Sequence, residues 1–276
     1  MRIGVLGCAG RMGRAVMAEV LASPACELAG GVEMPGHAAL GQDLGVLAGG
    51  EPAGRSASDD AAALIAAADV VIEFSGPAAT VAHVALAAAA GTGHVIGTTG
   101  LSAGEEQAIR AAAARTAILR AANMSLGINL LLGLAEQVAR ALPPAAFDAE
   151  IVEIHHKHKV DAPSGTALAL GAAVARGRGV ELAAVAEHGR DGLTGARAAG
   201  AIGFAALRGG DAVGDHSVIF AGIGERLELV HRATDRRIYA RGAVHAARWA
   251  KGQAPGLYGM PDVLGLTPAG APGGAA

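Results

Sequence analysis

The stretch that decides the fold is Arg2-Ile3-Gly4-Val5-Leu6, followed directly by Gly7-Cys8-Ala9-Gly10-Arg11-Met12-Gly13. The apolar run predicts a short buried strand, and the spacing over Gly13–Ala22 predicts a helix after the glycines. Glycines permit a tight turn and let backbone N–H groups approach a pyrophosphate, while a helix N-terminus adds partial positive charge. The G-x-x-G-x-x-G spacing is a variant of the dinucleotide fingerprint. We therefore expect a nucleotide-binding turn here rather than a glycine-rich turn without function.

An acidic residue stands where this kind of site needs one. Glu33 lies twenty residues beyond Gly13, at the end of the predicted strand Glu27–Val32, where a carboxylate can accept hydrogen bonds from a ribose. NADP-preferring enzymes usually place an arginine beside this acid, and here the neighbour is Met34. Arg11 and Arg14 remain available for that role, but we expect NADH to be used at least as well as NADPH.

Strands and helices alternate as far as Arg120, which predicts a doubly wound parallel sheet. The predicted helices are Asp60–Ala68, Pro77–Ala90 and a segment from the capping box of Ser102 and Glu105 to Ala114; the strands are Asp69–Phe74, His94–Ile96 and Ile118–Arg120, with Pro35–Asp59 mostly loop. Ligands collect at the carboxyl ends of such strands. The turn Gly97–Gly100 is therefore either part of the nicotinamide side or an ordinary turn, and Ala121–Met124 occupies the analogous place after the next strand.

Beyond Asn123 the pattern changes to strands in succession, which indicates a second domain with an antiparallel or mixed sheet. The predicted elements are a helix over Ser125–Leu142, a strand over Ala149–His156, a helix over Ser164–Arg176, strands over Ala201–Arg208, His216–Ala221 and Glu225–His231, and a helix over Arg241–Trp249. The predicted fold class is α/β, with a doubly wound parallel sheet and a central α+β domain.

The composition narrows the class of protein. Of 276 residues, 52% are hydrophobic and 17% charged, so the chain can bury a core and is not globally disordered. A net charge of −3 provides no basic excess for a nucleic acid. Two cysteines, Cys8 and Cys26, fit a reducing compartment, and no apolar run is long enough for a signal peptide or a membrane span. We expect a cytoplasmic protein without a membrane or nucleic-acid partner.

The segment richest in chemistry is Glu153-Ile154-His155-His156-Lys157-His158-Lys159-Val160-Asp161-Ala162-Pro163-Ser164-Gly165-Thr166-Ala167. The end of this segment opens a helix whose first N–H groups can bind an anion, and Lys159 adds a point charge, so a carboxylate substrate fits. A histidine here can act as proton donor or acceptor. Metal ligation by the histidines is disfavoured because adjacent strand residues face opposite ways and the lysines repel a cation. A solvated charged loop is the other alternative.

This segment is similar to the signature of dihydrodipicolinate reductases, E-x-H-H-x-x-K-x-D-A-P-S-G-T-A. The resemblance covers nearly the whole chain: it extends through Gly7–Gly13, Gly97–Thr99, Ala121–Met124, Ile202–Phe204, Gly214–His216, Gly224–Arg226, Gly256–Tyr258 and Asp262–Leu264. It implies an oxidoreductase that reduces 4-hydroxy-tetrahydrodipicolinate with NADH or NADPH in the diaminopimelate route of lysine biosynthesis.

The resemblance also implies a domain plan. Residues 1–124 would form a Rossmann domain with 236–270 packing back onto it, and 125–235 would bind the cyclic dicarboxylate substrate and build a homotetramer. Residues 271–276, within a stretch rich in Pro, Gly and Ala, are predicted to be a flexible tail.

Individual roles follow from the same resemblance. His155 would be the proton donor or acceptor, and Lys159 a second proton donor that also orients the substrate. The substrate carboxylate would be bound by His156, Lys159, Ser164, Gly165 and Thr166. The dinucleotide would be bound by Gly7, Cys8, Ala9, Gly10, Arg11, Met12, Glu33, Gly97, Thr98, Thr99, Ala121, Ala122, Asn123 and Met124.

Two other functions remain open. A phosphorylating semialdehyde dehydrogenase needs a nucleophilic cysteine, and neither Cys8 nor Cys26 is well placed for that role. A redox-sensing dinucleotide-binding module would keep Gly7–Gly13 without needing His155. The sequence assigns no role to Gly189–Ala199. We expect His216 and His231 to lie in the sheet of the second domain, near the site or an interface.

Overall fold

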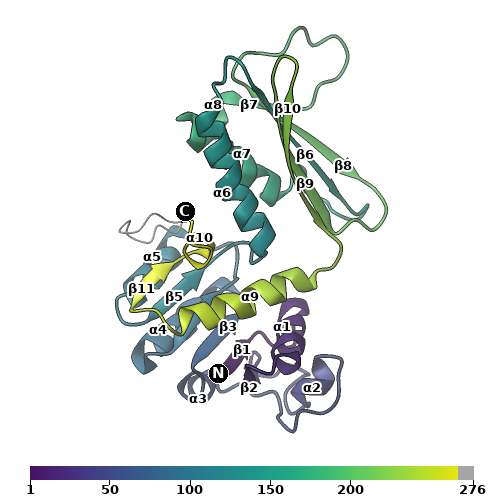
Figure 1. Cartoon of the computed structure of the whole chain (residues 1–276). Coiled ribbons are helices and arrows are strands. Elements are labelled where there is room, and N and C mark those ends of the chain that lie inside the picture. The colour runs from purple at the N-terminus through teal and green to yellow at the C-terminus, as the bar shows by residue number, and fades with distance from the viewer. Residues whose placement is uncertain (267–276) are drawn as a thin grey trace. The chain divides into compact units, whose positions relative to one another are not determined.

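The computed structural model describes residues 1–266, and the predicted tail 271–276 lies outside the described residues. The chain forms two compact units (Figure 1). Unit 1 consists of Met1–Leu126 together with the segment that starts at Arg237, and unit 2 is Gly127–Arg236. Each unit has its own sheet and its own core.

Unit 1 contains a six-stranded sheet in the order β11-β5-β4-β3-β1-β2, and every pairing is parallel. The strands are β1 (Arg2–Leu6), β2 (Glu27–Val32), β3 (Val70–Glu73), β4 (Gly93–Ile96), β5 (Ala117–Arg120) and β11 (Gly256–Tyr258). All residues of β3 and β4 are buried, as expected for strands covered on both faces. The predicted doubly wound parallel sheet is confirmed.

Helices cover both faces of this sheet (Figure 1). They are α1 (Arg11–Ala22), α2 (Leu44–Leu47), α3 (Ala61–Ala67), α4 (Pro77–Ala90), α5 (Ala103–Ala112), α9 (Arg237–Ala250) and α10 (Met260–Val263). Helices α1 and α9 share one core with the sheet, so the end of the chain completes the unit that its beginning starts. Helix α9 also lies close to the segment that follows β5: a Cβ on Gly242 of α9 would lie 1.7 Å from the Met124 carbonyl oxygen, so this position needs a small residue.

Unit 2 contains a five-stranded mixed sheet in the order β10-β9-β6-β8-β7. Its strands are β6 (Asp148–His155), β7 (Ala186–His188), β8 (Ile202–Arg208), β9 (Gly214–Ala221) and β10 (Arg226–Ala233). The pairings of β9 with β6 and β10 are antiparallel, and those of β8 with β6 and β7 are parallel. Helices α6 (Leu126–Ala141) and α7 (Gly165–Arg178) pack on one face, and α8 (Leu182–Val185) follows α7. This mixed sheet confirms the predicted fold class of the second part.

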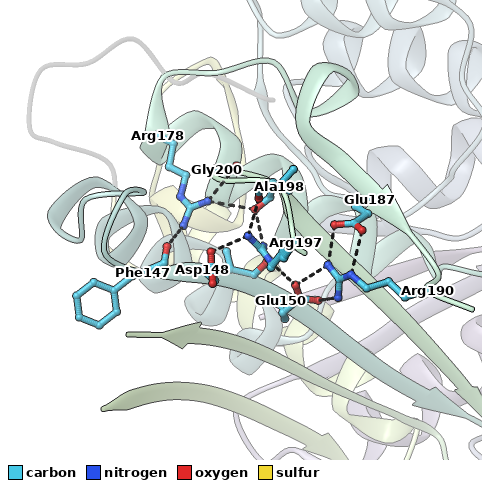
Figure 2. Close-up of polar contacts among 11 residues, drawn as sticks. Phe147, Asp148, Glu150, Arg178, Glu187, Arg190, Arg197, Ala198 and Gly200 are labelled. Atoms are coloured by element: carbon cyan, nitrogen blue, oxygen red, sulfur yellow. Dashed lines mark hydrogen bonds and ion pairs between the residues drawn. The ribbon is translucent and has the colours of Figure 1, made fainter. Parts of the chain in front are cut away.

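Two arginines of the segment Gly189–Ala199 hold it to β6 (Figure 2). They are Arg190 and Arg197, while Arg178 of α7 donates to the carbonyls of Phe147, Gly200 and Ala201 just beyond the segment. Arg197 donates to Asp148 at 2.7 Å and to Glu150 at 2.8 Å, and Arg190 forms a two-pronged ion pair with the same Glu150. Glu150 therefore fixes both ends of a segment for which the sequence indicated no role.

The described elements that the sequence did not predict are all short, and some predicted elements differ at their ends, such as α9, which begins at Arg237 rather than Arg241. Helices α2, α8 and α10 have four residues each, and strands β7 and β11 have three, which is too short for a periodic pattern. The capping box of Ser102 and Glu105 at α5 is confirmed. Within residues 1–266, no helix has the length and apolar character needed to cross a membrane.

Candidate active site

The glycines of the first turn are required by packing. Gly7 has φ of +77°, and a Cβ there would lie 2.5 Å from the Phe74 carbonyl oxygen. A Cβ on Gly13 would lie 2.1 Å from the Gly7 carbonyl oxygen, so the first turn of α1 can approach the strand end only without a side chain. Gly10 is the N-cap of α1. The turn thus places the positive end of a helix dipole at the carboxyl edge of the sheet.

A cavity of about 470 Å³ lies at this edge of unit 1. Its lining includes the predicted residues Gly10, Arg11, Met12, Gly97, Thr98, Thr99, Ala122, Asn123 and Met124, together with Phe74, Ser75 and Tyr239. The sequence prediction did not include the last three. Gly7, Cys8, Ala9, Glu33 and Ala121 do not line this cavity, although the first three belong to the turn that forms its wall.

Glu33 and Arg14 both contact the turn. The Ala9 N–H donates to Glu33 Oε1 at 2.7 Å, and Arg14 Nε donates to the Ala9 carbonyl at 2.8 Å. Arg14 also donates to the Leu47 carbonyl at 3.3 Å. The guanidinium of Arg14 is therefore engaged with backbone carbonyls, while Met34 is 68% exposed.

Cys8 is buried beneath the turn, and its thiol is unreactive. Burial, and then the negative charge of Glu33, raise the pKa of Cys8 to about 11. A thiol with so high a pKa is protonated at neutral pH and is a poor nucleophile. Cys8 therefore gives no support to a cysteine-dependent dehydrogenase.

A buried carboxylate stands directly behind the cavity. Glu73, the last residue of β3, is fully buried and bonds to His83 Nδ1 at 2.7 Å and to His94 Nε2 at 2.8 Å. Ser75, which lines the cavity, donates its hydroxyl to the same carboxylate at 2.5 Å. Burial alone would raise the pKa of Glu73, but the bonds from the two histidines outweigh it and lower that pKa to about 2. The charged carboxylate joins the end of β3 to β4 and α4 beside the cavity.

The proposed proton donor of unit 2 is held by a second buried carboxylate. His155 Nδ1 lies 2.5 Å from Glu153 Oε2, and both side chains project from β6 to the same face. Glu153 also accepts two bonds from the Arg208 guanidinium, at 2.7 and 2.9 Å, and one from the Ser164 N–H at 3.1 Å. Glu153 is only 1% exposed, so these donors compensate for the loss of water around its charge.

The other predicted substrate residues lie on the loop and helix that follow. Lys159 Nζ bonds to both oxygens of Asp161, at 2.8 and 2.9 Å. His156 Nε2 lies 3.1 Å from the Arg236 guanidinium, beside an open hollow of about 730 Å³ that Lys157 and His158 also line. Partial burial and the charge of Arg236 lower the pKa of His156. The hollow is lined by two cations, Lys157 and Arg236, and one acidic residue, Asp211, so positive charge that a carboxylate ligand requires is present.

Ser164 is the N-cap of α7, and its hydroxyl accepts the Ala167 N–H at 3.1 Å. The same hydroxyl lies 3.0 Å from His216 Nε2 of β9. Burial lowers the pKa of His216 to about 4, so this histidine is neutral at physiological pH. Gly165 and Thr166 form the first turn of α7, where the helix dipole favours an anion. The structure therefore brings His155, Ser164 and His216 together on the buried side of the sheet, with His231 on the neighbouring strand β10.

Sequence reasoning assigned no role to Glu153 or Arg208, whereas His216 and His231 lie on β9 and β10 of the second sheet, as expected. Glu153 stands two residues before His155, and the alternation of a strand was a usable signal because it places both on one face. Arg208 had no such signal, and neither did the contact of His216 with Ser164, since both depend on which strands pair.

Comparison with known proteins agrees with this geometry. Residues 1–124 match a family described as dihydrodipicolinate reductase, N-terminus, and residues 127–264 match dihydrodipicolinate reductase, C-terminus. A 4-hydroxy-tetrahydrodipicolinate reductase of Rhodopseudomonas palustris strain BisB18 is 55% identical over 267 residues, which covers 97% of this chain and 98% of the relative.

The chain belongs to the dihydrodipicolinate reductase family.

A second member of the dihydrodipicolinate reductase family, from Parvibaculum lavamentivorans, is 56% identical and covers 96% of this chain and 98% of its own length. Among solved structures, a dipicolinate-bound dihydrodipicolinate reductase from Paenisporosarcina sp. TG-14 has a TM-score of 0.77 at 24% identity, covering 95% of this chain and 98% of that one. The last comparison supports the fold alone. The predicted family and its oxidoreductase class are confirmed by the sequence relatives.

Proposed function

We propose that this chain reduces 4-hydroxy-tetrahydrodipicolinate to tetrahydrodipicolinate with NADH or NADPH, in the diaminopimelate route of lysine biosynthesis. The observation that carries this proposal is the buried Glu153–His155 pair beside Lys159 and the N-terminus of α7, in a chain of this family. A proton donor next to groups that attract carboxylates is what reduction of a cyclic dicarboxylate needs.

The residues of unit 1 fit a nicotinamide dinucleotide. A Cβ on Gly10 would meet only the Gly7 carbonyl, at 3.3 Å, so Gly10 leaves room beside the helix N-terminus for a pyrophosphate. Gly10–Met12 would hold the pyrophosphate, Glu33 the adenosine ribose, and Gly97–Thr99 with Ala122–Met124 the nicotinamide half. When bound, the cofactor supplies a hydride to the substrate.

The residues of unit 2 supply the proton and the positive charge. Because Nδ1 of His155 is bonded to Glu153, Nε2 is the ring atom left to give a proton to the substrate. Lys159 serves as a second proton donor, and its charge together with that of His155 stabilises the negative charge that develops during reduction. His156, Ser164, Gly165 and Thr166 bind and orient the carboxylates.

We propose that NADH is used at least as well as NADPH. Arg14 bonds to the carbonyls of Ala9 and Leu47, and an exposed Met34 stands beside Glu33 in place of an arginine. A 2′-phosphate next to the Glu33 carboxylate would meet a negative charge without a paired cation. A large NADPH preference in steady-state kinetics would contradict this proposal.

We propose further that the chain forms a homotetramer through unit 2 and works in the cytoplasm. The face of the mixed sheet opposite α6 and α7 carries half-buried Val152 and Ile154 beside exposed Leu207 and Val230, an apolar surface that a second copy would cover. Light scattering after size exclusion tests the mass. Both cysteines are unpaired, which supports a reducing compartment.

The decisive experiment follows NADH absorbance while the substrate is made fresh by the preceding synthase from pyruvate and aspartate semialdehyde. We expect substrate-dependent oxidation, and a loss of about two or more orders of magnitude in kcat for His155→Gln. No oxidation with either cofactor, by a folded protein that binds NADH, would reject the reductase. Equal activity of His155→Gln and wild type would favour a dinucleotide-binding redox sensor instead.

A further inference from the structure

We infer that Arg208 and Glu153 are positioning residues that set the orientation of both proton donors, His155 and Lys159, through one guanidinium. The inference rests on the proposed function, which names His155 and Lys159 as the donors, but the contacts it uses all lie within unit 2.

The first part of this hydrogen-bonded arrangement is the Glu153 carboxylate. Its Oε2 bonds to His155 Nδ1 and Arg208 Nη1, and its Oε1 bonds to Arg208 Nη2 and the Ser164 N–H. Four donors from β6, β8 and the start of α7 thus meet at one buried group. Burial alone would raise the pKa of Glu153, but the bonds from Arg208 and His155 outweigh it and lower that pKa. The carboxylate is therefore charged, and it holds the His155 ring with Nε2 turned away from it.

The second part is the Arg208 guanidinium, which contacts Asp161 as well as Glu153. Arg208 pairs with His155 in the register of β8 against β6. Its Nη2 also donates to the Asp161 carbonyl at 2.5 Å, and the Asp161 carboxylate holds Lys159 Nζ. One planar cation therefore joins the strand that carries His155 to the loop that carries Lys159. The ammonium of a lysine cannot match the fork that reaches both Glu153 oxygens and a carbonyl.

The charges around His155 come from several elements. Glu153 is on β6, Arg208 on β8, and His156 and Lys159 follow in the loop. His216 of β9 faces the ring edge-on, with centroids 5.1 Å apart, but it is neutral at physiological pH. Removing the cation of Arg208 would leave the Glu153 charge less compensated, which favours the protonated form of His155. Removing the charge of Glu153 would have the opposite effect.

The opposite effects of the two substitutions on the protonation of His155 distinguish a positioning role of Arg208 and Glu153 from that of a merely structural ion pair. A structural role predicts that any loss of Arg208 lowers stability without moving the pH dependence of turnover. A positioning role predicts that the variants move the pH profile in directions set by the charge that each removes.

The test compares Arg208→Met, Arg208→Lys and Glu153→Gln with wild type. Arg140→Met is the matched control, because Arg140 lies on α6 of the same unit, is 64% exposed and pairs only with Glu136 among the described ion pairs. For each variant, kcat is measured across pH, NADH Kd by fluorescence titration, and the His155 ring by NMR titration with His155→Gln for assignment.

We expect Arg208→Met to lose about tenfold or more in kcat. The pH at which its kcat falls on the alkaline side of the profile should rise by about one unit. In Glu153→Gln, kcat should fall at a lower pH than in wild type. In Arg208→Lys, kcat should fall at the wild-type pH, but only part of the wild-type kcat should be recovered. NADH Kd should stay within about twofold for all variants, because the predicted cofactor residues belong to unit 1.

The inference is overturned if Arg208→Met and Glu153→Gln, both folded, keep the wild-type pH dependence of kcat and the wild-type NMR titration of His155. If Arg208→Met fails to fold, Glu153→Gln alone decides: an alkaline fall of kcat at lower pH than in wild type supports the inference, and an unchanged or higher pH overturns it. If the wild type proves inactive, the proposed function fails, and the NMR titration still decides whether Glu153 and Arg208 set the protonation of His155.

Discussion

Replacing Glu73 by Gln is expected to lower the free energy of unfolding of unit 1 by about 3 kcal/mol at neutral pH. The buried carboxylate accepts hydrogen bonds from His83, His94 and Ser75. In Gln, the amide NH2 group would face one of these three donors and could not accept its hydrogen bond. The magnitude follows from the pKa of Glu73, which falls from 4.5 to about 2 on folding. At roughly 1.4 kcal/mol per pKa unit, this shift gives the expected loss.

The sign of the pH dependence follows from the same shift. Because the pKa of Glu73 is lower in the folded chain, its contribution is fully present above pH 4.5 and disappears as the pH falls toward about 2. The difference in stability between wild type and Glu73→Gln should therefore shrink as the pH falls below about 4.5.

The single tryptophan makes the assay specific to unit 1. Trp249 lies on α9 and packs against the core of that unit, so its fluorescence during urea unfolding reports on the unit that contains Glu73. A loss of about 3 kcal/mol should lower the urea midpoint by roughly 1–3 M. The matched control is Glu27→Gln in the same unit, whose exposed pair with Arg55 should contribute less than about 1 kcal/mol. Equal, small shifts for both variants would refute the reasoning.

Three further substitutions test the two sites. Gly97→Ala should raise the NADH Kd about tenfold, because its Cβ would lie 2.1 Å from the Phe74 ring; an unchanged Kd would show that the ring moves freely. Gly214→Ala should lower kcat about tenfold without changing the NADH Kd, because its Cβ would lie 2.8 Å from His155 Nε2; wild-type kcat would contradict the assigned donor atom. Met34→Arg should raise kcat/KM for NADPH about tenfold, and steady-state kinetics showing no gain would remove this position from cofactor choice.

The sequence determined the features that depend on neighbours along the chain. The glycines from Gly7 to Gly13 predict a close approach of backbone to ligand, since any Cβ at two of these positions would meet backbone atoms. The alternation of apolar strands and helices predicted the parallel sheet, and Ser102 with Glu105 predicted the start of α5. The long motif around His155 was sufficient to indicate the family, because many residue types in a fixed order are improbable by chance.

Tertiary structure decided the features that depend on strand pairing. Arg208 reaches Glu153 across 55 residues of sequence, and His216 reaches Ser164 across 52. These contacts exist because β6 lies between β8 and β9 in one particular register, and a shift by one residue would turn each side chain to the other face. The partners of Glu73 come likewise from α4 and β4, which the order of strands brings beside it. A local pattern records which face of a strand is buried, but the neighbour met on that face is fixed only when the sheet assembles.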